Sequence, residues 1–172
     1  GTDRIYEALK ILDRNDVDLI MNIQGDEPEI DIEDIKKLDN NMKNNKKAKI
    51  GTLAVKISDI RMYKNQNVVK VKTQEKLKNN NFVLAIKVSR DDFSKQNSNV
   101  YHHIGIYCYK TSTLKKFVNL KQTKNEIKSR LEQIRAMDNN IKISVALAKS
   151  SPIGVDTKED YLALKKIMEY KS

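Results

Sequence analysis

The chain has 172 residues, of which 39% are hydrophobic, enough to bury one core, so we expect a single domain over residues 1–172. No apolar run is long enough to cross a bilayer, and no charged-then-apolar leader is present, so we expect a cytoplasmic protein with no membrane partner. The only cysteine, Cys108, excludes a disulfide within the chain, and its apolar neighbours favour a structural thiol.

The formal net charge of +10 would suit a nucleic-acid partner. However, the lysines are scattered among acidic residues, apart from a run at residues 43–49 that is typical of a solvated loop. Aromatic residues make up only 6% of the chain, and no nucleic-acid-binding motif is evident. We therefore expect no nucleic acid, and keep a basic nucleic-acid-binding module as the non-enzymatic alternative.

The N-terminal part alternates between helical and strand patterns. Apolar residues at helical spacing predict a first helix that ends near residue 15 and is capped by Thr2 or Asp3. A strand is expected over residues 19–23, and a second helix starts with a capping-box-like pair, Asp31 and Asp34. Helix, strand and helix in this order indicate a parallel sheet.

The middle of the chain favours antiparallel pairing. Strands are predicted over residues 50–57, 68–71, 82–88 and 104–109, and polar residues between the second and third are typical of a hairpin connection. Residues 89–99 lack apolar periodicity and are expected to form a loop.

The C-terminal third returns to helical patterns. A helix capped by Ser112 and a second helix over residues 126–137 precede a strand over residues 141–148. Thr157 and Asp160 form a capping-box-like pair that opens the last helix.

Two aspartates occupy corresponding places in this order. Asp26 and Asp156 each follow an apolar stretch and a glycine, and each precedes a helix, so they lie where open α/β sheets bind ligands. Carboxylate oxygens are preferred ligands of Mg²⁺, which makes both candidates for a magnesium site. The alternatives are that Asp26 forms a turn and that Asp156 with Thr157 only caps the last helix.

A histidine and a tyrosine share one side of a predicted strand. His103 alternates with Gly105 and Tyr107, so all three face the same way. A histidine in such a place is more often structural than functional.

Six segments together resemble the 3-deoxy-manno-octulosonate cytidylyltransferases, or CMP-Kdo synthetases. They are Gly-Thr-Asp-Arg, Asn-Ile-Gln-Gly-Asp-Glu-Pro, Asn-Val-Val-Lys-Val, His-Ile-Gly-Ile-Tyr, Leu-Glu-Gln-Ile-Arg and Gly-Val-Asp-Thr, which begin at residues 1, 22, 67, 103, 131 and 154. A shorter Ser-Arg match lies at residues 89–90. The motifs occur in the family's order and extend over the whole chain.

The resemblance implies a three-layer, Rossmann-like (GT-A-like) nucleotidyltransferase fold with a mixed α/β sheet. It implies transfer of CMP from CTP to the anomeric hydroxyl of Kdo, with release of pyrophosphate, for lipopolysaccharide biosynthesis by a homodimer. Asp26 and Asp156 would be catalytic and would bind Mg²⁺. The residues implied to bind substrates are Arg4, Gln24, Arg90, His103, Tyr107, Glu132 and Gln133.

Two departures concern the sugar. Residues 91–94 replace the small residue and Ile-Pro pair that usually follow Ser-Arg, and Ser129 stands where the family usually carries an acid. A related acid sugar, either an amino-Kdo or a nonulosonic acid, is therefore kept as the alternative substrate.

The sequence opens inside a family motif, without the nucleotide-binding loop that family members carry near their N-terminus. We expect it to be the C-terminal portion of a longer enzyme that lacks the first strand. The isolated 172 residues should then form no CMP-sugar from CTP and Kdo in a pyrophosphate-release assay. Measurable product from this piece alone would contradict that expectation.

Overall fold

The computed structural model describes residues 1–14, 16–25, 30–79, 81–95, 98–150 and 158–169. The described strands are β1 (Leu19–Asn22), β2 (Ile50–Lys56), β3 (Lys70–Thr73), β4 (Val83–Ser89), β5 (Val100–Lys110) and β6 (Ile143–Leu147). The described helices are α1 (Thr2–Ile11), α2 (Ile32–Asn44), α3 (Arg61–Lys64), α4 (Thr111–Val118), α5 (Lys124–Ser129), α6 (Gln133–Asp138) and α7 (Lys158–Glu169). Among them, no helix is both long enough and apolar enough to cross a membrane.

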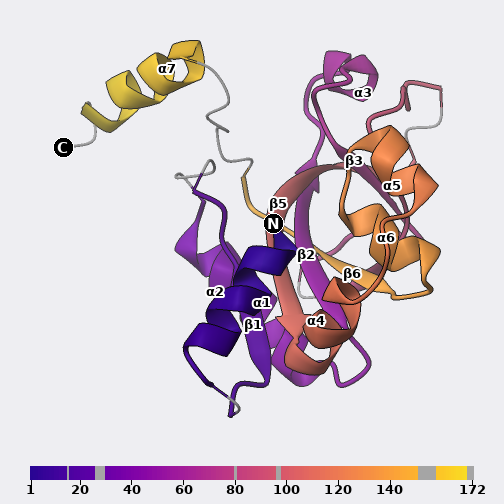
Figure 1. The fold of residues 1–172 in the computed structure, drawn as a ribbon. Helices are drawn as coiled ribbons and strands as arrows, with labels where there is room; N and C mark the ends of the chain where they lie inside the picture. Colours follow the sequence, from indigo (N-terminus) through magenta and orange to yellow (C-terminus); the bar gives the residue numbers. More distant parts are fainter. Residues whose placement is uncertain (15, 26–29, 80, 96–97, 151–157, 170–172) are drawn as a thin grey trace.

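The strands form one mixed sheet in the order β1-β5-β2-β6-β4-β3, and β3 also pairs with β5 (Figure 1). Because β3 pairs with both β4 and β5, the strands β5, β2, β6, β4 and β3 form a closed ring of pairings. This long strand serves three neighbours, because its first residues pair with β3, its last residues with β1, and most of its length with β2. β2 and β6 are parallel, whereas β5 is antiparallel to both β1 and β2.

The strand directions decide which strand ends share an edge of the sheet. β1 and β2 run the same way on either side of β5, and β6 is parallel to β2. The carboxyl ends of β1, β2 and β6 therefore lie at one edge, which is where open α/β sheets bind ligands. The parallel arrangement predicted for the N-terminal part is confirmed in direction, since β1 and β2 run the same way, but antiparallel β5 lies between them.

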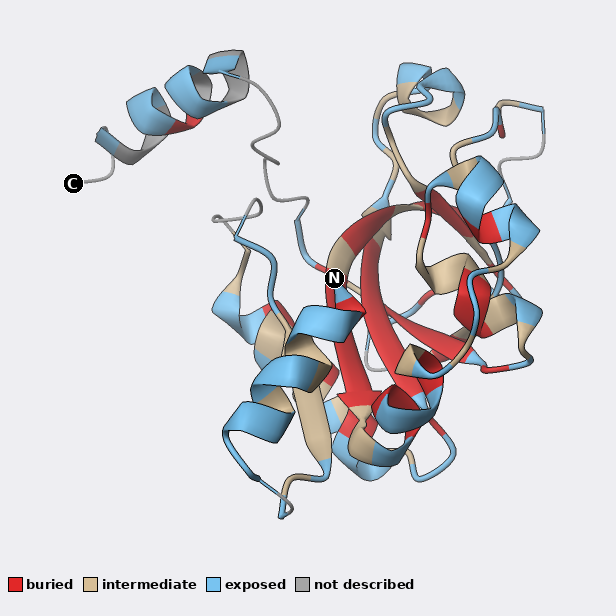
Figure 2. Ribbon diagram, viewed as in Figure 1, coloured by how far each residue is buried: buried red, intermediate tan, exposed pale blue. Residues whose placement is uncertain are grey.

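Apolar side chains on both faces of the sheet are covered by helices, which gives three layers. On one face, Leu38 and Met42 of α2 pack against Leu53, Ile104 and Ile106. On the other face, α4 and α6 pack against the neighbouring side chains, which are Ile50, Tyr107, Tyr109 and Ile143. β2 and β5 are accordingly mostly buried (Figure 2).

Several predicted helix boundaries were wrong. α1 has no side-chain cap, because the Thr2 hydroxyl bonds elsewhere, and α4 starts after Lys110 without a cap from Ser112. The helix predicted over residues 126–137 is two helices, separated where Arg130 adopts a left-handed conformation with φ 51°. Asp31 does cap α2, but the carboxylate of Asp34 accepts a bond from the backbone N–H of Lys149 instead of forming a capping box.

The other predicted elements are present, but some of their ends are shifted. α1 ends at Ile11, four residues before the predicted end, β5 begins four residues earlier than expected at Val100, and β3 begins two residues later. The antiparallel pairings of the middle section are as predicted. The expected cap from Thr157 lies outside the described residues.

Gly51 allows α2 to approach β2 closely. A Cβ at this position would lie 2.8 Å from Met42 Sδ, 2.9 Å from Phe82 Cζ and 3.0 Å from Leu38 Cδ1. Gly51→Ala is therefore expected to lower the free energy of unfolding by about 1–3 kcal/mol, because three core side chains must shift together. Urea unfolding measures this. Gly25→Ala is the matched control, since nothing lies within 4 Å of its Cβ, and equal stability of the two variants would contradict the crowding.

Candidate active site

The structure brings His103 and Tyr107 together on the face of β5 that α4 and α6 cover. Both residues are 7% exposed, and their ring centroids are 5.3 Å apart. Tyr107 stacks in turn on Tyr109 at 5.9 Å, and Tyr109 lies 6.5 Å from Phe117 of α4. The guanidinium of Arg135 is 5.0 Å from the Phe117 ring centre. These five side chains form a continuous row, called here the aromatic row, which ends in the Leu-Glu-Gln-Ile-Arg motif.

The backbone of β5 leaves regular pairing next to His103. Thr52 of β2 pairs with Tyr107, but the next residue, Leu53, pairs with Ile104, so Gly105 and Ile106 have no partner residue on β2. Two extra residues keep the alternation of sides intact, which is why His103 and Tyr107 still face the same way.

Side chains from two other strands satisfy the carbonyls of this irregular stretch. The Thr52 hydroxyl lies 2.7 Å from the Ile106 oxygen, 3.3 Å from the Ile104 oxygen and 2.9 Å from Nε2 of His103. Gln24, just beyond β1, donates from Nε2 to the Gly105 oxygen at 2.8 Å. Gln24 therefore lies against β5 two residues from His103, and its role toward a substrate stays a prediction.

Burial keeps the His103 imidazole neutral. Desolvation, and to a smaller degree the neighbouring His102, lowers the pKa of His103 to about 3. A ring with this pKa cannot supply a positive charge to a ligand near neutral pH. It can only donate or accept hydrogen bonds.

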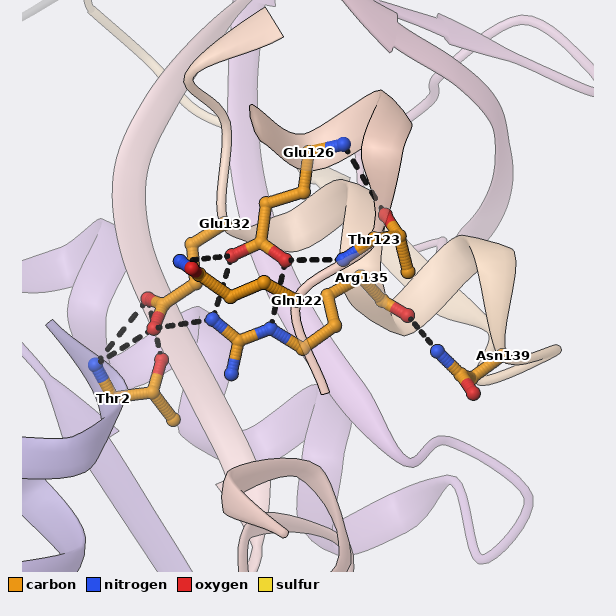
Figure 3. A network of polar contacts seen from close by, with 7 residues as sticks. All are labelled: Thr2, Gln122, Thr123, Glu126, Glu132, Arg135 and Asn139. Carbon is orange, nitrogen blue, oxygen red and sulfur yellow. Dashed lines mark hydrogen bonds and ion pairs between the residues drawn. The ribbon is translucent and has the colours of Figure 1, made fainter. Parts of the chain in front are cut away.

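Glu132 bonds the start of α1 in this structure. Its carboxylate accepts from the Thr2 hydroxyl at 2.6 Å and from the Thr2 backbone N–H at 3.3 Å (Figure 3). Thr2 is 1% exposed, and burial raises the pKa of Tyr109. Glu132 thus lies beside the far end of the aromatic row, and its carboxylate oxygens are already used within the chain.

A buried ion pair holds the helices that carry Glu132. Arg135 donates from Nε and Nη2 to the two carboxylate oxygens of Glu126, at 2.9 and 2.6 Å. This contact is the main cause of the lowered pKa of Glu126. Thr123 and Glu126 also form a capping box at the start of α5 (Figure 3). Arg135 is therefore a structural cation, which fixes the turn between α5 and α6.

Arg90 is fixed by backbone carbonyls near the N-terminal part of β5, where His103 lies. Its Nη1 donates to the oxygens of Gln66 and Asn67, and the following Val69 oxygen accepts from the His103 N–H. Lys70, which is fully buried, donates from Nζ to the oxygens of Asn65 and Arg90. Desolvation lowers the pKa of Lys70. Arg90 and Lys70 thus connect the end of β4 to residues 65–67, which precede β3.

The remaining predicted residues are less constrained. Arg4 is exposed on α1, and Gln133, the first residue of α6, is partly exposed. Cys108 is buried, and its burial raises the pKa of the thiol to about 12, as expected for a structural cysteine.

Asp26 and Asp156 both lie outside the described residues, so the predicted metal site stays a prediction. Within the described part of the chain, no three acidic, histidine or cysteine side chains are close enough to hold a metal ion. The flanking residues do meet, however. Asp34 accepts from the Lys149 N–H at 2.9 Å, and Lys149 Nζ lies 3.3 Å from Asp31. The start of α2 and Lys149, which follows β6, therefore lie side by side.

Lysines gather at the opposite edge of the sheet. A hollow of about 530 Å³ is lined by Lys43, Lys46, Lys110 and Lys115 with a single acid, Asp18. A second hollow of about 410 Å³ is lined by Lys47, Lys49, Lys116 and Lys142. The lysine run at residues 43–49 is therefore joined by lysines from β5, α4 and the start of β6, which the sequence order alone did not indicate.

Sequence reasoning missed Thr52 and Lys70 as residues that shape the site. Thr52 is a polar residue within the mostly apolar β2, Lys70 stands between Val69 and Val71, and both are buried. A polar side chain on the core side of a strand has to find a partner, which is the signal that could have identified both.

The low pKa of His103 makes stability depend on pH. An unfolded histidine binds a proton near pH 6.5, whereas the folded one does so only near pH 3. The stability from this group is thus present above pH 6.5 and is lost as pH falls toward 3. Between pH 7 and 5 the free energy of unfolding should fall by about 2 kcal/mol from His103 alone.

Urea unfolding at both pH values tests this. The His103→Asn variant should not show this loss of stability, and the matched variant His102→Asn should show most of it. Equal pH dependence of wild type and His103→Asn would contradict the assignment.

Comparison with known proteins agrees with this architecture. A family model described as "Cytidylyltransferase" matches residues 1–143. The 3-deoxy-manno-octulosonate cytidylyltransferase of Brucella ovis is 38% identical over 161 residues, which cover 93% of this chain and 63% of that protein. The 3-deoxy-manno-octulosonate cytidylyltransferase of Bartonella henselae is 36% identical over 173 residues, which cover 98% of this chain and 68% of that protein. The chain thus spans less than two thirds of the length of the Brucella relative.

Solved structures show the same similarity. A CMP:2-keto-3-deoxy-manno-octonic acid synthetase complexed with CTP has a TM-score of 0.87 and 26% identity over 100% of this chain and 69% of its own. A 4-diphosphocytidyl-2C-methyl-D-erythritol synthase from Anaerococcus prevotii shares the fold, with a TM-score of 0.56. Its sequence is 16% identical, and the match covers 95% of this chain and 64% of that protein. With a family model over most of its residues and these relatives, the chain belongs to the cytidylyltransferase family.

Proposed function

We propose that this chain is part of an enzyme that transfers CMP from CTP to the anomeric hydroxyl of 3-deoxy-manno-octulosonate. The observation that carries the proposal is the match of the whole chain, at a TM-score of 0.87, to a synthetase of that CMP-sugar complexed with CTP. The enzyme would serve lipopolysaccharide biosynthesis as a cytoplasmic homodimer.

The described site supports binding of a polyhydroxylated acid. His103 and Tyr107 offer a neutral ring nitrogen and a phenol on one strand, and Gln24 lies beside them at the carboxyl edge. Arg90 contributes a cation fixed by the oxygens of Gln66 and Asn67. Hydroxyl-binding groups near a fixed guanidinium suit a sugar that carries a carboxylate.

A magnesium ion fits this proposal through the chemistry of its donors. Asp26 lies five residues before Asp31 and Asp156 seven residues after Lys149 in the sequence, and Lys149 contacts Asp31 and Asp34, which supports a shared site for the two aspartates. Carboxylate oxygens from both would hold the ion, which supplies positive charge against the phosphate oxygens.

The reaction needs no covalent enzyme intermediate. The anomeric oxygen of the sugar attacks the α-phosphorus of CTP and forms a new P–O bond, while the bond from that phosphorus to the bridging oxygen breaks. Pyrophosphate leaves with the electron pair, and the hydroxyl proton passes to solvent. The task of the protein is to hold the two substrates in line, which accounts for a site built on rigid strands.

The identity of the acid sugar is the finer part of the proposal. Residues 91–94 differ from the family pattern, and in the structure Asp91 pairs with Lys87 next to Arg90. Full-length enzyme should release pyrophosphate from CTP faster with Kdo than with an amino-Kdo or a nonulosonic acid. A preference for one of the latter would replace Kdo as the substrate and keep the reaction.

The metal proposal is tested by removing single charges. Asp26→Asn and Asp156→Asn in the full-length enzyme should each lower kcat at least about a hundredfold in the presence of Mg²⁺, since charge on the transferring phosphate is then poorly balanced. Pyrophosphate release measures the rate. The matched control is Asp16→Asn, at an exposed residue that precedes β1 at the other end of the strand.

Chelation of divalent ions should abolish activity of the wild-type enzyme, and added Mg²⁺ should restore it. Full activity of both site variants, or full activity in a chelator, would refute the magnesium site. No CTP-dependent pyrophosphate release with any of the acid sugars would refute the proposed function itself.

A further inference from the structure

Thr52 is a buried hydroxyl in an otherwise apolar strand. It is 1% exposed, and its Oγ1 contacts three groups of β5 at once. They are the Ile106 oxygen at 2.7 Å, His103 Nε2 at 2.9 Å and the Ile104 oxygen at 3.3 Å. A buried hydroxyl with this many partners determines which of them donates and which accepts.

The single hydroxyl proton decides the state of His103. A carbonyl oxygen can only accept, so the short contact to Ile106 takes the proton of Thr52. The lone pair of Oγ1 then faces His103 Nε2, which has to donate. If Nε2 were the acceptor instead, the hydroxyl and carbonyl lone pairs would oppose each other at 2.7 Å.

We propose that Thr52 is a positioning residue that fixes His103 in the Nε2–H form, so that Nδ1 accepts a hydrogen bond from a hydroxyl of the sugar. The role of His103 toward the sugar rests on the proposed function, whereas the state of the ring does not. The ring carries one proton near neutral pH because burial keeps its pKa at about 3. With that proton on Nε2, Nδ1 bears a lone pair.

This arrangement assigns the groups of an acid sugar to different partners. A carboxylate has no proton to donate at neutral pH, so it gains nothing from an accepting Nδ1. Only a hydroxyl can bond the ring there. The carboxylate then binds a cation such as Arg90, and the histidine accepts a hydrogen bond from a hydroxyl of the sugar.

The surrounding backbone holds the ring in this orientation. Thr52 donates to the Ile106 oxygen, Gln24 donates to the Gly105 oxygen, and the His103 N–H donates to the Val69 oxygen at 3.0 Å. The strand therefore has little freedom to turn the imidazole over, and the tautomer is set before a ligand arrives.

Nitrogen-15 NMR of the histidine rings tests the tautomer directly on this chain, with His102→Gln to assign the two rings. Wild type near pH 7 should give a protonated Nε2 and an unprotonated Nδ1. Thr52→Val keeps the side-chain shape and removes the hydroxyl, so its spectrum should move toward a mixture of tautomers. Thr52→Ser should restore the wild-type pattern, and amide spectra establish that each variant is folded.

Kinetics of the full-length enzyme test the consequence. Thr52→Val should raise the KM for the acid sugar about tenfold, the effect of one hydrogen bond, with little change in the KM for CTP. Thr52→Ser should stay near wild type. A merely structural role for Thr52 would change both KM values or neither.

The outcomes separate the two claims. An Nδ1–H ring in wild type, or an unchanged tautomer in Thr52→Val, overturns the positioning role whatever the enzyme does. An Nε2–H ring that Thr52→Ser preserves, combined with no CTP-dependent activity on any acid sugar, upholds the tautomer control and overturns the proposed function. Equal sensitivity of both KM values overturns the role toward the sugar.

Discussion

One hydroxyl group satisfies the backbone at the point where β2 and β5 lose register. Thr52 pairs with Tyr107, directly after the two residues that the β2 register skips, and its hydroxyl contacts the oxygens of Ile104 and Ile106. Unsatisfied carbonyls in a buried sheet cost free energy comparable to a lost hydrogen bond, so this hydroxyl, together with Gln24 at the Gly105 oxygen, stabilises the irregular stretch. The irregular stretch in turn sets His103 and Tyr107 side by side, and the site depends on that spacing.

Local patterns in the sequence were sufficient for most elements and for the common face of His103 and Tyr107, because alternation in a strand is a local property. They were insufficient for contacts made across the fold. The Thr2 hydroxyl looked like a helix cap but bonds Glu132, which is 130 residues away. Arg130 adopts a left-handed turn inside what looked like a continuous helix, since the Arg135–Glu126 pair and the Thr123 cap stabilise the break.

Some motif residues bond other parts of the chain. The side chain of Gln24 bonds a strand carbonyl, and Glu132 bonds the start of α1. Residues that resemble ligand contacts can thus act as part of the frame that holds those contacts. Thr52 and Lys70 belong to the same frame, and the three-dimensional partners of their polar atoms show which carbonyls each one bonds.

The aromatic row connects the layers of the molecule. It runs from the sheet at His103 through Tyr107 and Tyr109 to Phe117 and Arg135 in the helical layer. A small molecule resting against its first ring would therefore brace packed rings that extend into α4 and α6. Amide hydrogen exchange would then become slower in α4 and α6 as well as in β5, so binding at the site would make helices remote from it more rigid.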